Sequence, residues 1–227
     1  MAARLALPAL LLAALFPQAA SVEPKPPRGA HTIAVVRGSV PLRSKPNGRV
    51  LATALARTEF GGPRVLSVAA RRGSWLGVVA TELPNGRLAC VNVGNRALRL
   101  RRIVYSLHAD RSERSLELWK GGRRVRRMTV AVGRPGSETP IGRFAVTDKL
   151  RGSRYGPYYG CCILALNGHQ PHLPAGWPGG DRLAIHGTDS PGTIGTAASA
   201  GCLRAADADL ELLMRRVPLG TPVFIRD

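Results

Sequence analysis

The chain has 227 residues, 44% of them hydrophobic and 21% charged, which suits one ordinary domain or two small ones and excludes a disordered tail. It contains 26 glycines and 18 prolines but only 5% aromatic residues, a balance that favours many turns, short strands and few helices. No apolar run reaches the roughly 18 residues that a membrane-spanning helix needs, so we expect no transmembrane span in the mature chain.

The chain is strongly basic, with 33 lysines and arginines against 14 acidic residues and a net charge of +19. Such an excess favours polyanions, which include nucleic acids, anionic cell-wall polymers and carboxylate-bearing substrates. The basic residues are scattered, with short clusters only at 99–102 and 123–127, and no nucleic-acid-binding motif accompanies them. We therefore expect an anionic cell-wall partner and no nucleic-acid partner.

The first 21 residues have the pattern of a secretory signal peptide. Arg4 precedes an apolar run over residues 5–16, and small residues follow up to Ser21. We expect a signal peptide over 1–21 and a linker over 22–30, where three prolines oppose a helix. The protein is then expected outside the cytoplasm, secreted, periplasmic or associated with the cell wall, where thiols tend to oxidise. A retained anchor and a buried N-terminal helix are the alternatives.

Residues 31–100 are predicted to form a small β domain. Turn signals, such as the Pro-Asn-Gly at 46–48, separate short apolar segments at the spacing typical of small barrels. Strands are expected at 32–36, 49–54, 64–70, 75–81 and 87–93. Residues 40–46 and 75–78 resemble bacterial SH3-like domains, although Cys90 stands where that family often has a tryptophan. The resemblance implies an SH3-like barrel.

Residues 102–227 are predicted to form a second, larger β domain with few helices. Strands are expected at 103–107, 115–120, 125–132, 143–148, 183–186 and 223–225, so the fold class is mainly β. Apolar residues recur at i, i+3, i+4 and i+7 from Leu210 to Val217, which indicates one amphipathic helix. Asp207 is its candidate N-cap.

A histidine and a cysteine near the C-terminal end form a candidate nucleophilic pair. His186 ends a predicted buried strand, and Cys202 follows sixteen residues later in a loop with the small residues Ala200 and Gly201. A thiol becomes an effective nucleophile near neutral pH when a base or a positive field favours its thiolate. If the two groups touch, the pair can exist as thiolate and imidazolium, and their titrations are then coupled. The backbone N–H groups of Gly201 and Cys202 are expected to form an oxyanion hole.

Several segments of the C-terminal half resemble, in the correct order, the signature of the L,D-transpeptidase (YkuD) catalytic-domain family. The core motifs correspond to His-Gly-Thr at 186–188 and Ser-Ala-Gly-Cys-Leu-Arg at 199–204. Residues 132–144 and 218–223 correspond to the flanking segments, so that the resemblance covers about residues 102–227. It implies a β-sandwich-like fold and no metal or organic cofactor.

The resemblance also implies roles for individual residues. Cys202 is the nucleophile and His186 the general base, and the Gly187 carbonyl orients the imidazole. Ala200 replaces the second motif histidine of the family, which removes the loop hydrogen bonds of that imidazole but neither catalytic group. The other residues that the resemblance places in the site, as loop, oxyanion or substrate-binding groups, are Ser199, Gly201, Arg204 and Tyr155.

By this resemblance the reaction is acyl transfer in peptidoglycan. The thiol attacks the carbonyl of the third residue of a stem tetrapeptide, the terminal D-Ala leaves, and an amine of an acceptor stem takes the acyl group to give a 3-3 cross-link. Attachment of a protein to the wall and simple removal of D-Ala remain open, because they differ only in the acceptor. Stem peptides carry carboxylates that suit the positive surface. Arg204 either meets such a carboxylate, braces the loop or forms a structural salt bridge.

The remaining cysteines and histidines admit other interpretations. Cys161 and Cys162 with His169 and His172 form a weak candidate zinc site whose spacing matches no strong signature. Alternatively, Cys90 pairs with Cys161 or Cys162 and joins the two domains. Two further histidines are expected at the surface, His31 and His108.

Two functions compete with acyl transfer. One is a catalytically silent module that binds the cell wall, which has no need of both His186 and Cys202. The other is a cell-wall cysteine peptidase of the NlpC/P60 kind. In that family the cysteine precedes the histidine, whereas here the histidine comes first.

Overall fold

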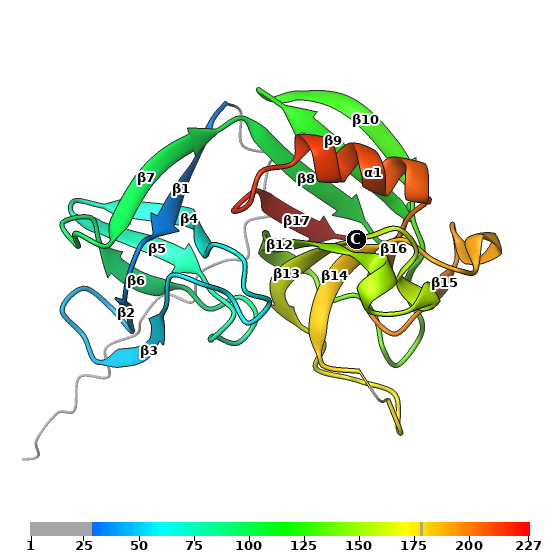
Figure 1. Cartoon of the computed structure of the whole chain (residues 1–227), viewed down its shortest axis with the longest axis horizontal. Coiled ribbons are helices and arrows are strands. Elements are labelled where there is room, and N and C mark those ends of the chain that lie inside the picture. The colour runs from blue at the N-terminus through cyan, green and yellow to red at the C-terminus, as the bar shows by residue number, and fades with distance from the viewer. Residues whose placement is uncertain (1–28, 178) are drawn as a thin grey trace, which may run out of the picture.

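The structure is a computed structural model that describes residues 29–177 and 179–227 (Figure 1). The predicted signal peptide over 1–21 and most of the predicted linker lie outside the described residues. Within these ranges the chain is mainly β with a single α-helix, which confirms the predicted fold class. None of their helices is long and apolar enough to cross a membrane. Figure 1 shows two β units side by side, with the N-terminal one on the left.

The N-terminal unit is a curled sheet of seven strands in the order β3-β2-β6-β5-β4-β1-β7. One face forms its core, because Leu42 and Leu76 are fully buried while their neighbours Arg43 and Trp75 are half-buried on the other face. Its SH3-like character stays a prediction. The strands are β1 (His31–Val36), β2 (Val40–Arg43), β3 (Val50–Ala54), β4 (Val65–Arg72), β5 (Trp75–Val79), β6 (Ala89–Asn92) and β7 (Leu98–Ile103).

The C-terminal unit contains an eight-stranded sheet in the order β10-β9-β8-β17-β12-β13-β14-β16, and β11 pairs with β15 beside it. The helix α1 (Asp207–Arg216) packs its buried Leu210 and Leu213 against the core of this unit. The strands are β8 (Tyr105–Asp110), β9 (Ser115–Lys120), β10 (Arg123–Thr129), β11 (Val132–Gly133), β12 (Gly142–Arg151), β13 (Cys162–His169), β14 (Arg182–His186), β15 (Ala197–Ser199), β16 (Leu203–Arg204) and β17 (Pro222–Arg226).

Two strands of some length escaped the sequence prediction for opposite reasons. The strand β13 lies between β12 and β14, and seven of its eight residues are buried, so it lacks the alternation of a half-exposed strand. The edge strand β7 is the reverse case, because four of its six residues are exposed and three are arginines. Its apolar pattern is therefore weak.

Three local predictions are wrong. The N-cap of α1 is Ala206, and Asp207 is its first helical residue, whose carboxylate accepts a hydrogen bond from the Cys161 N–H instead. His31 is buried, with 7% of its surface exposed. His108 is stacked on Phe224 with the ring centroids 4.9 Å apart. His31 therefore belongs to the packed interior, and His108 is half-buried against an aromatic neighbour rather than free at the surface.

The two units contact each other next to the strands that carry the predicted site. Asn85 donates a hydrogen bond to the His169 carbonyl at 2.6 Å and accepts one from the His169 N–H at 2.9 Å. Glu59 forms an ion pair with Arg182, the first residue of β14. The N-terminal unit thus supports the ends of both β13 and β14.

Candidate active site

The first predicted catalytic residue, His186, is the last residue of β14 and is completely buried. Its Nδ1 lies 2.6 Å from the Gly187 carbonyl oxygen, which can only accept a hydrogen bond. The proton of the neutral ring therefore lies on Nδ1, and Nε2 keeps its lone pair. Among the described residues Nε2 has no hydrogen-bond partner, so it is free to accept a proton.

The second predicted catalytic residue, Cys202, directly precedes β16, which runs parallel to β14. The register pairs Ile185 with Leu203 and His186 with Arg204, which places Cys202 beside Ala184. Side chains two residues apart on a strand share a face, so Cys202 and His186 project to the same side of the sheet. Both line one narrow cavity of about 40 Å³.

Burial keeps both members of this pair neutral at rest. Burial lowers the pKa of His186 to about 4, although its hydrogen bond to the Gly187 carbonyl acts in the opposite direction. Burial also raises the pKa of Cys202 to about 11. Both shifts favour a thiol and a neutral imidazole at rest over a thiolate–imidazolium pair. Neutral imidazole is the form that can act as a general base.

The loop that carries the nucleophile is closed by one serine. Ser199 Oγ accepts a hydrogen bond from the Gly201 N–H at 3.0 Å and donates one to the Cys202 carbonyl at 2.6 Å. Because its N–H is used in this way, Gly201 braces the loop rather than facing a substrate carbonyl. The Cys202 N–H, for which the described part of the chain shows no acceptor, is the donor left for an oxyanion.

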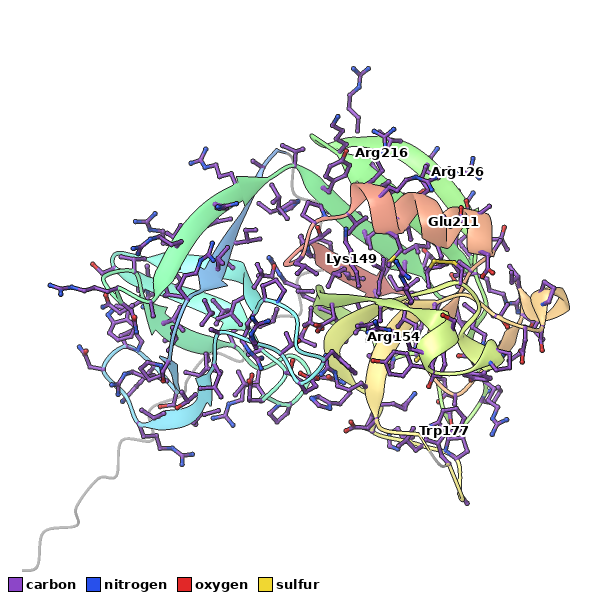
Figure 2. All side chains as sticks on the ribbon, viewed as in Figure 1. Arg126, Lys149, Arg154, Trp177, Glu211 and Arg216 are labelled. Carbon is purple, nitrogen blue, oxygen red and sulfur yellow. A yellow bond between two sulfur atoms is a disulfide. The ribbon has the colours of Figure 1, made fainter. Side chains whose placement is uncertain are left out.

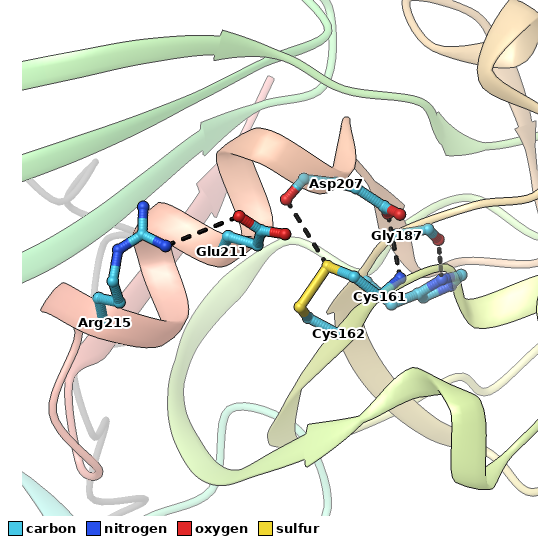
Figure 3. Close-up of a disulfide and its surroundings, with 7 residues drawn as sticks. Cys161, Cys162, Gly187, Asp207, Glu211 and Arg215 are labelled. Carbon is cyan, nitrogen blue, oxygen red and sulfur yellow. Dashed lines mark hydrogen bonds and ion pairs between the residues drawn. A yellow bond between two sulfur atoms is a disulfide. The ribbon is translucent and has the colours of Figure 1, made fainter.

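Gly187 allows the close packing that orients the histidine. A Cβ at this position would lie 2.2 Å from Asp207 Oδ1, so no larger residue fits. The Gly187 N–H donates to the Cys162 carbonyl at 3.0 Å. Asp207 Oδ1 accepts from the Cys161 N–H at 3.1 Å, as Figure 3 shows. The first residue of α1 and the start of β13 thereby fix the Gly187 carbonyl.

The structure also settles which cysteines are joined. Cys161 and Cys162 form a disulfide with each other, and Cys90 is free, so the expected bond between the two domains is wrong. The zinc alternative involved His169, whose ring contacts Asp181 Oδ2 at 2.9 Å and the Thr81 carbonyl at 2.7 Å. Within residues 29–177 and 179–227, no cluster of three or more ligand side chains has the arrangement of a metal site.

Aromatic side chains form one wall of the cavity. The rings of Tyr158 and Tyr159 lie 5.5 and 5.0 Å from the His186 ring, measured between centroids. Trp177 lines the cavity from the long connection between β13 and β14, which extends away from the sheet (Figure 2). Tyr155, the tyrosine predicted from the sequence, is 44% exposed and lies outside this lining, packed against Phe60 and Tyr159.

Arg204 supports this aromatic wall. It is 8% exposed, donates a hydrogen bond to the Tyr158 hydroxyl, and its guanidinium carbon lies 4.6 Å from the centroid of that ring. No carboxylate of the described residues lies within ion-pair distance of Arg204, so the salt-bridge alternative is wrong. The side chain of Arg204 braces Tyr158 in the aromatic wall, and the bracing of the nucleophile loop that the sequence suggested stays a prediction.

Sequence reasoning missed several residues of the cavity wall. Tyr158 and Tyr159 lie in a short helix, Pro157–Tyr159, that precedes β13, and Gln170 directly follows that strand. Because neither element was predicted, no pattern assigned these residues to the site. The one available signal was the cluster of tyrosines at 155–159, and the sequence prediction named only its first tyrosine, Tyr155. The lining residues that were missed are Tyr158, Tyr159, Gln170, Leu173, Trp177, Gly180, Asp181, Arg182 and Ala184.

Comparison with known proteins places this geometry in a family. Residues 104–225, more than half of the chain, match the model of the YkuD family, described as the L,D-transpeptidase catalytic domain. Over 125 residues the chain is 31% identical to YkuD of Bacillus licheniformis, a protein named for the L,D-transpeptidase activity expected of it. The match covers 54% of this chain and 66% of that relative. YqjB of Bacillus subtilis, named in the same way, is 33% identical over 108 residues, covering 44% of this chain and 58% of that relative.

Solved structures of the same description are more distant. L,D-transpeptidase 3 from Mycobacterium tuberculosis, in complex with a faropenem-derived adduct, has a TM-score of 0.45 and 17% identity, covering 62% of this chain and 73% of that one. An L,D-transpeptidase from Mycobacterium smegmatis has a TM-score of 0.44 and 16% identity, covering 71% of this chain and 82% of that one.

Proposed function

We propose, from the premise that the chain belongs to the L,D-transpeptidase (YkuD) catalytic-domain family, that it is a cysteine acyltransferase acting on peptidoglycan stem peptides. The observation that carries the proposal is the pairing of β14 with β16, which brings His186 and Cys202 into one cavity. A free imidazole nitrogen and a thiol that line the same cavity are the two groups that covalent acyl transfer needs.

The acylation step follows from these groups. Cys202 Sγ attacks the carbonyl carbon of the third residue of a stem tetrapeptide while its proton passes to His186 Nε2. The Cys202 N–H donates to the oxygen that becomes negative. When the tetrahedral intermediate collapses, the bond to the terminal D-Ala breaks and His186 returns the proton to the leaving amine. The product is a thioester on Cys202 and free D-Ala.

The second half-reaction releases the enzyme. An amine of an acceptor stem attacks the thioester carbonyl, and His186 Nε2 takes the proton that this amine loses. The carbon–sulfur bond then breaks, the Cys202 thiol is re-formed, and the new amide is a 3-3 cross-link. Water or a protein amine in the same position would give hydrolysis or attachment to the wall.

The charge and the N-terminal pattern support a location where such substrates occur. Stem peptides carry free carboxylates, and a net charge of +19 raises the local concentration of anionic polymers. The signal-peptide pattern over 1–21 supports export to the periplasm or the cell wall. Within the aromatic wall, Arg204 and Tyr158 supply positive charge and a hydroxyl close to the cavity. Anionic cell-wall polymers are the second class of partner that the charge supports.

The proposal is tested by incubating the purified protein with a disaccharide-tetrapeptide and measuring the products by mass spectrometry. We expect loss of D-Ala and formation of a cross-linked dimer. The Cys202→Ala variant should fall to the background rate with an unchanged melting temperature, whereas the matched Cys90→Ala variant should keep most activity. Turnover by Cys202→Ala would refute the assigned nucleophile. Binding without turnover by the wild type would favour the silent wall-binding module.

A further inference from the structure

Gln170 makes an unusual set of hydrogen bonds beside the nucleophile. It directly follows β13, and only 5% of its surface is exposed. Its Nε2 lies 3.2 Å from the Ala200 carbonyl oxygen. The same atom lies 3.1 Å from the Ser137 carbonyl oxygen and 3.0 Å from that of Glu138. Since an amide nitrogen carries two hydrogens, three acceptors consume its whole capacity to donate.

The rest of the side chain is fixed as firmly. Its Oε1 accepts a hydrogen bond from the His172 N–H at 3.0 Å, and its backbone N–H donates to the Asp181 carbonyl at 2.6 Å. A Cβ at Gly201 would lie 2.0 Å from Gln170 Nε2, so the amide packs directly against that glycine. Gly201 has a φ of +121°, a conformation that glycine adopts readily and other residues avoid.

The location of Gln170 suggests two roles, a contact with the substrate or support of the nucleophile loop, and its hydrogen bonds decide between them. It lines the same cavity as His186 and Cys202. Its two donor hydrogens are, however, engaged with three backbone carbonyls, and its Oε1 already accepts from the His172 N–H, so the amide has no donor left for a substrate carbonyl or carboxylate. The groups that it joins lie in the loop after β11 and in the loop before β16. Gln170 therefore links the nucleophile loop to a second loop. It supplies the hydrogen bonds that the side chain of Ala200, which has no polar atom, cannot make.

We infer that Gln170 is the positioning residue of the nucleophile loop, an inference that deepens the proposed function and rests on it for the chemistry of Cys202. By holding the Ala200 carbonyl, the amide fixes the peptide that leads into Gly201 and so sets the direction of the Cys202 N–H. That N–H must point at the oxyanion of a tetrahedral intermediate. A loop that turns by a small amount loses this alignment, because displacements of about 1 Å at a reacting centre cost about a hundredfold in rate.

The inference distinguishes two reactions of the same thiol. Acylation of Cys202 by an activated ester passes through a tetrahedral intermediate and needs the oxyanion donor. Alkylation by iodoacetamide displaces iodide at a saturated carbon and needs no such donor. Gln170→Met keeps the length and the packing of the side chain but donates no hydrogen bond. Gln170→Glu keeps the shape and the acceptor for the His172 N–H, and its carboxylate cannot donate to the carbonyls.

The experiment compares the two rates at Cys202, measured by mass spectrometry with p-nitrophenyl acetate and with iodoacetamide. We expect each Gln170 variant to lose about 10- to 100-fold in acylation and less than about threefold in alkylation. In turnover of the disaccharide-tetrapeptide, kcat should fall while KM stays near the wild-type value. The matched control is Asn85→Ala, which removes two amide hydrogen bonds to His169 but does not touch the nucleophile loop. Its ratio of acylation to alkylation should equal that of the wild type.

Each other result has a definite meaning. An unchanged ratio of acylation to alkylation in both Gln170→Met and Gln170→Glu would overturn the inference. If both rates fall equally, the cause is a general loss of structure, and if neither falls, the hydrogen bonds of Gln170 have no role in acylation. A wild-type protein that is acylated by the ester but does not turn over the tetrapeptide would refute the proposed substrate. A lowered ratio in the Gln170 variants would still support the positioning role in that case.

Discussion

The protonation state of the nucleophile gives the sharpest test of the site. Burial raises the pKa of Cys202 to about 11 and lowers that of His186 to about 4, so both groups are neutral between these values. An ordinary cysteine has a pKa of about 8.5 and is about 3% thiolate at pH 7. A pKa of about 11 leaves a thiolate fraction of about one in ten thousand at the same pH. Alkylation of Cys202, which needs the thiolate, should therefore be about 300-fold slower than for an ordinary cysteine.

The assay follows iodoacetamide labelling of Cys202 against pH, with peptide mapping so that Cys90, the other free cysteine, is measured in the same sample. The rate at Cys202 should rise about tenfold for each pH unit from neutrality to about pH 10, without a plateau. In His186→Gln the labelling profile should stay within about threefold of the wild type. Acyl transfer should nevertheless be lost in that variant, because the imidazole acts only while the carbonyl is attacked.

The opposite pattern would refute this reasoning. A plateau of labelling below about pH 8, together with a fall of tenfold or more in His186→Gln, would show that a thiolate–imidazolium pair exists at rest. The burial argument would then fail, although the assignment of the two catalytic residues would survive. Labelling of Cys90 should be unaffected by the His186 substitution in either case.

Three further predictions concern stability and the geometry of the site. Burial holds the pKa of His186 and of His108 at about 4, below the value of about 6.5 in the unfolded chain, so the unfolded state binds more protons between these values. The part of the free energy of unfolding that depends on neutral His186, on the order of 3 kcal/mol, should be complete above about pH 6.5 and lost as the pH falls to about 4. Urea unfolding at several pH values measures this dependence, and His108→Phe should make it flatter. Gly187→Ala should lower acyl transfer by 100-fold or more, because its Cβ would lie 2.2 Å from Asp207 Oδ1; labelled-substrate turnover measures the loss. A carbapenem should add its mass to the peptide that contains Cys202, and an adduct at another residue would count against the nucleophile.

The catalytic pair could be predicted from the sequence because its two motifs are local. His186 ends a short strand whose last four residues are all buried, and Cys202 lies in a short segment rich in small residues, so each motif can be found from its own neighbours in the sequence. The long-range contact that joins them, the parallel pairing of β14 with β16, was not predicted, because no periodicity marks the two-residue strand β16. The mainly β fold class was equally accessible, because turn residues separate most of the strands.

The walls of the site could not be predicted in the same way. Gln170 and Tyr158 reach the cavity only because β13 runs through the centre of the sheet, and a strand buried on both faces shows no alternation. Tyr155 was predicted from the resemblance of residues 155–157 to a family segment, whereas the cavity is lined by Tyr158 and Tyr159 of the short helix that follows, and no sequence pattern tells which of these rings faces the site. The protonation states depend on burial, a property of the assembled fold rather than of either motif.

The neutral resting pair and the braced loop together explain how the site can keep its nucleophile unreactive until a substrate binds. A thiolate is the form that reacts with oxidants and stray electrophiles, and burial suppresses it at Cys202 until a carbonyl is in place. The attack must then occur with little further rearrangement, since proton transfer to His186 and donation from the Cys202 N–H have to coincide. A rigid loop meets this requirement. Ser199 supplies the rigidity from within the loop, and Gln170 supplies it from outside. Loss of the Gln170 contact should therefore affect the acylation step and leave the resting thiol unchanged.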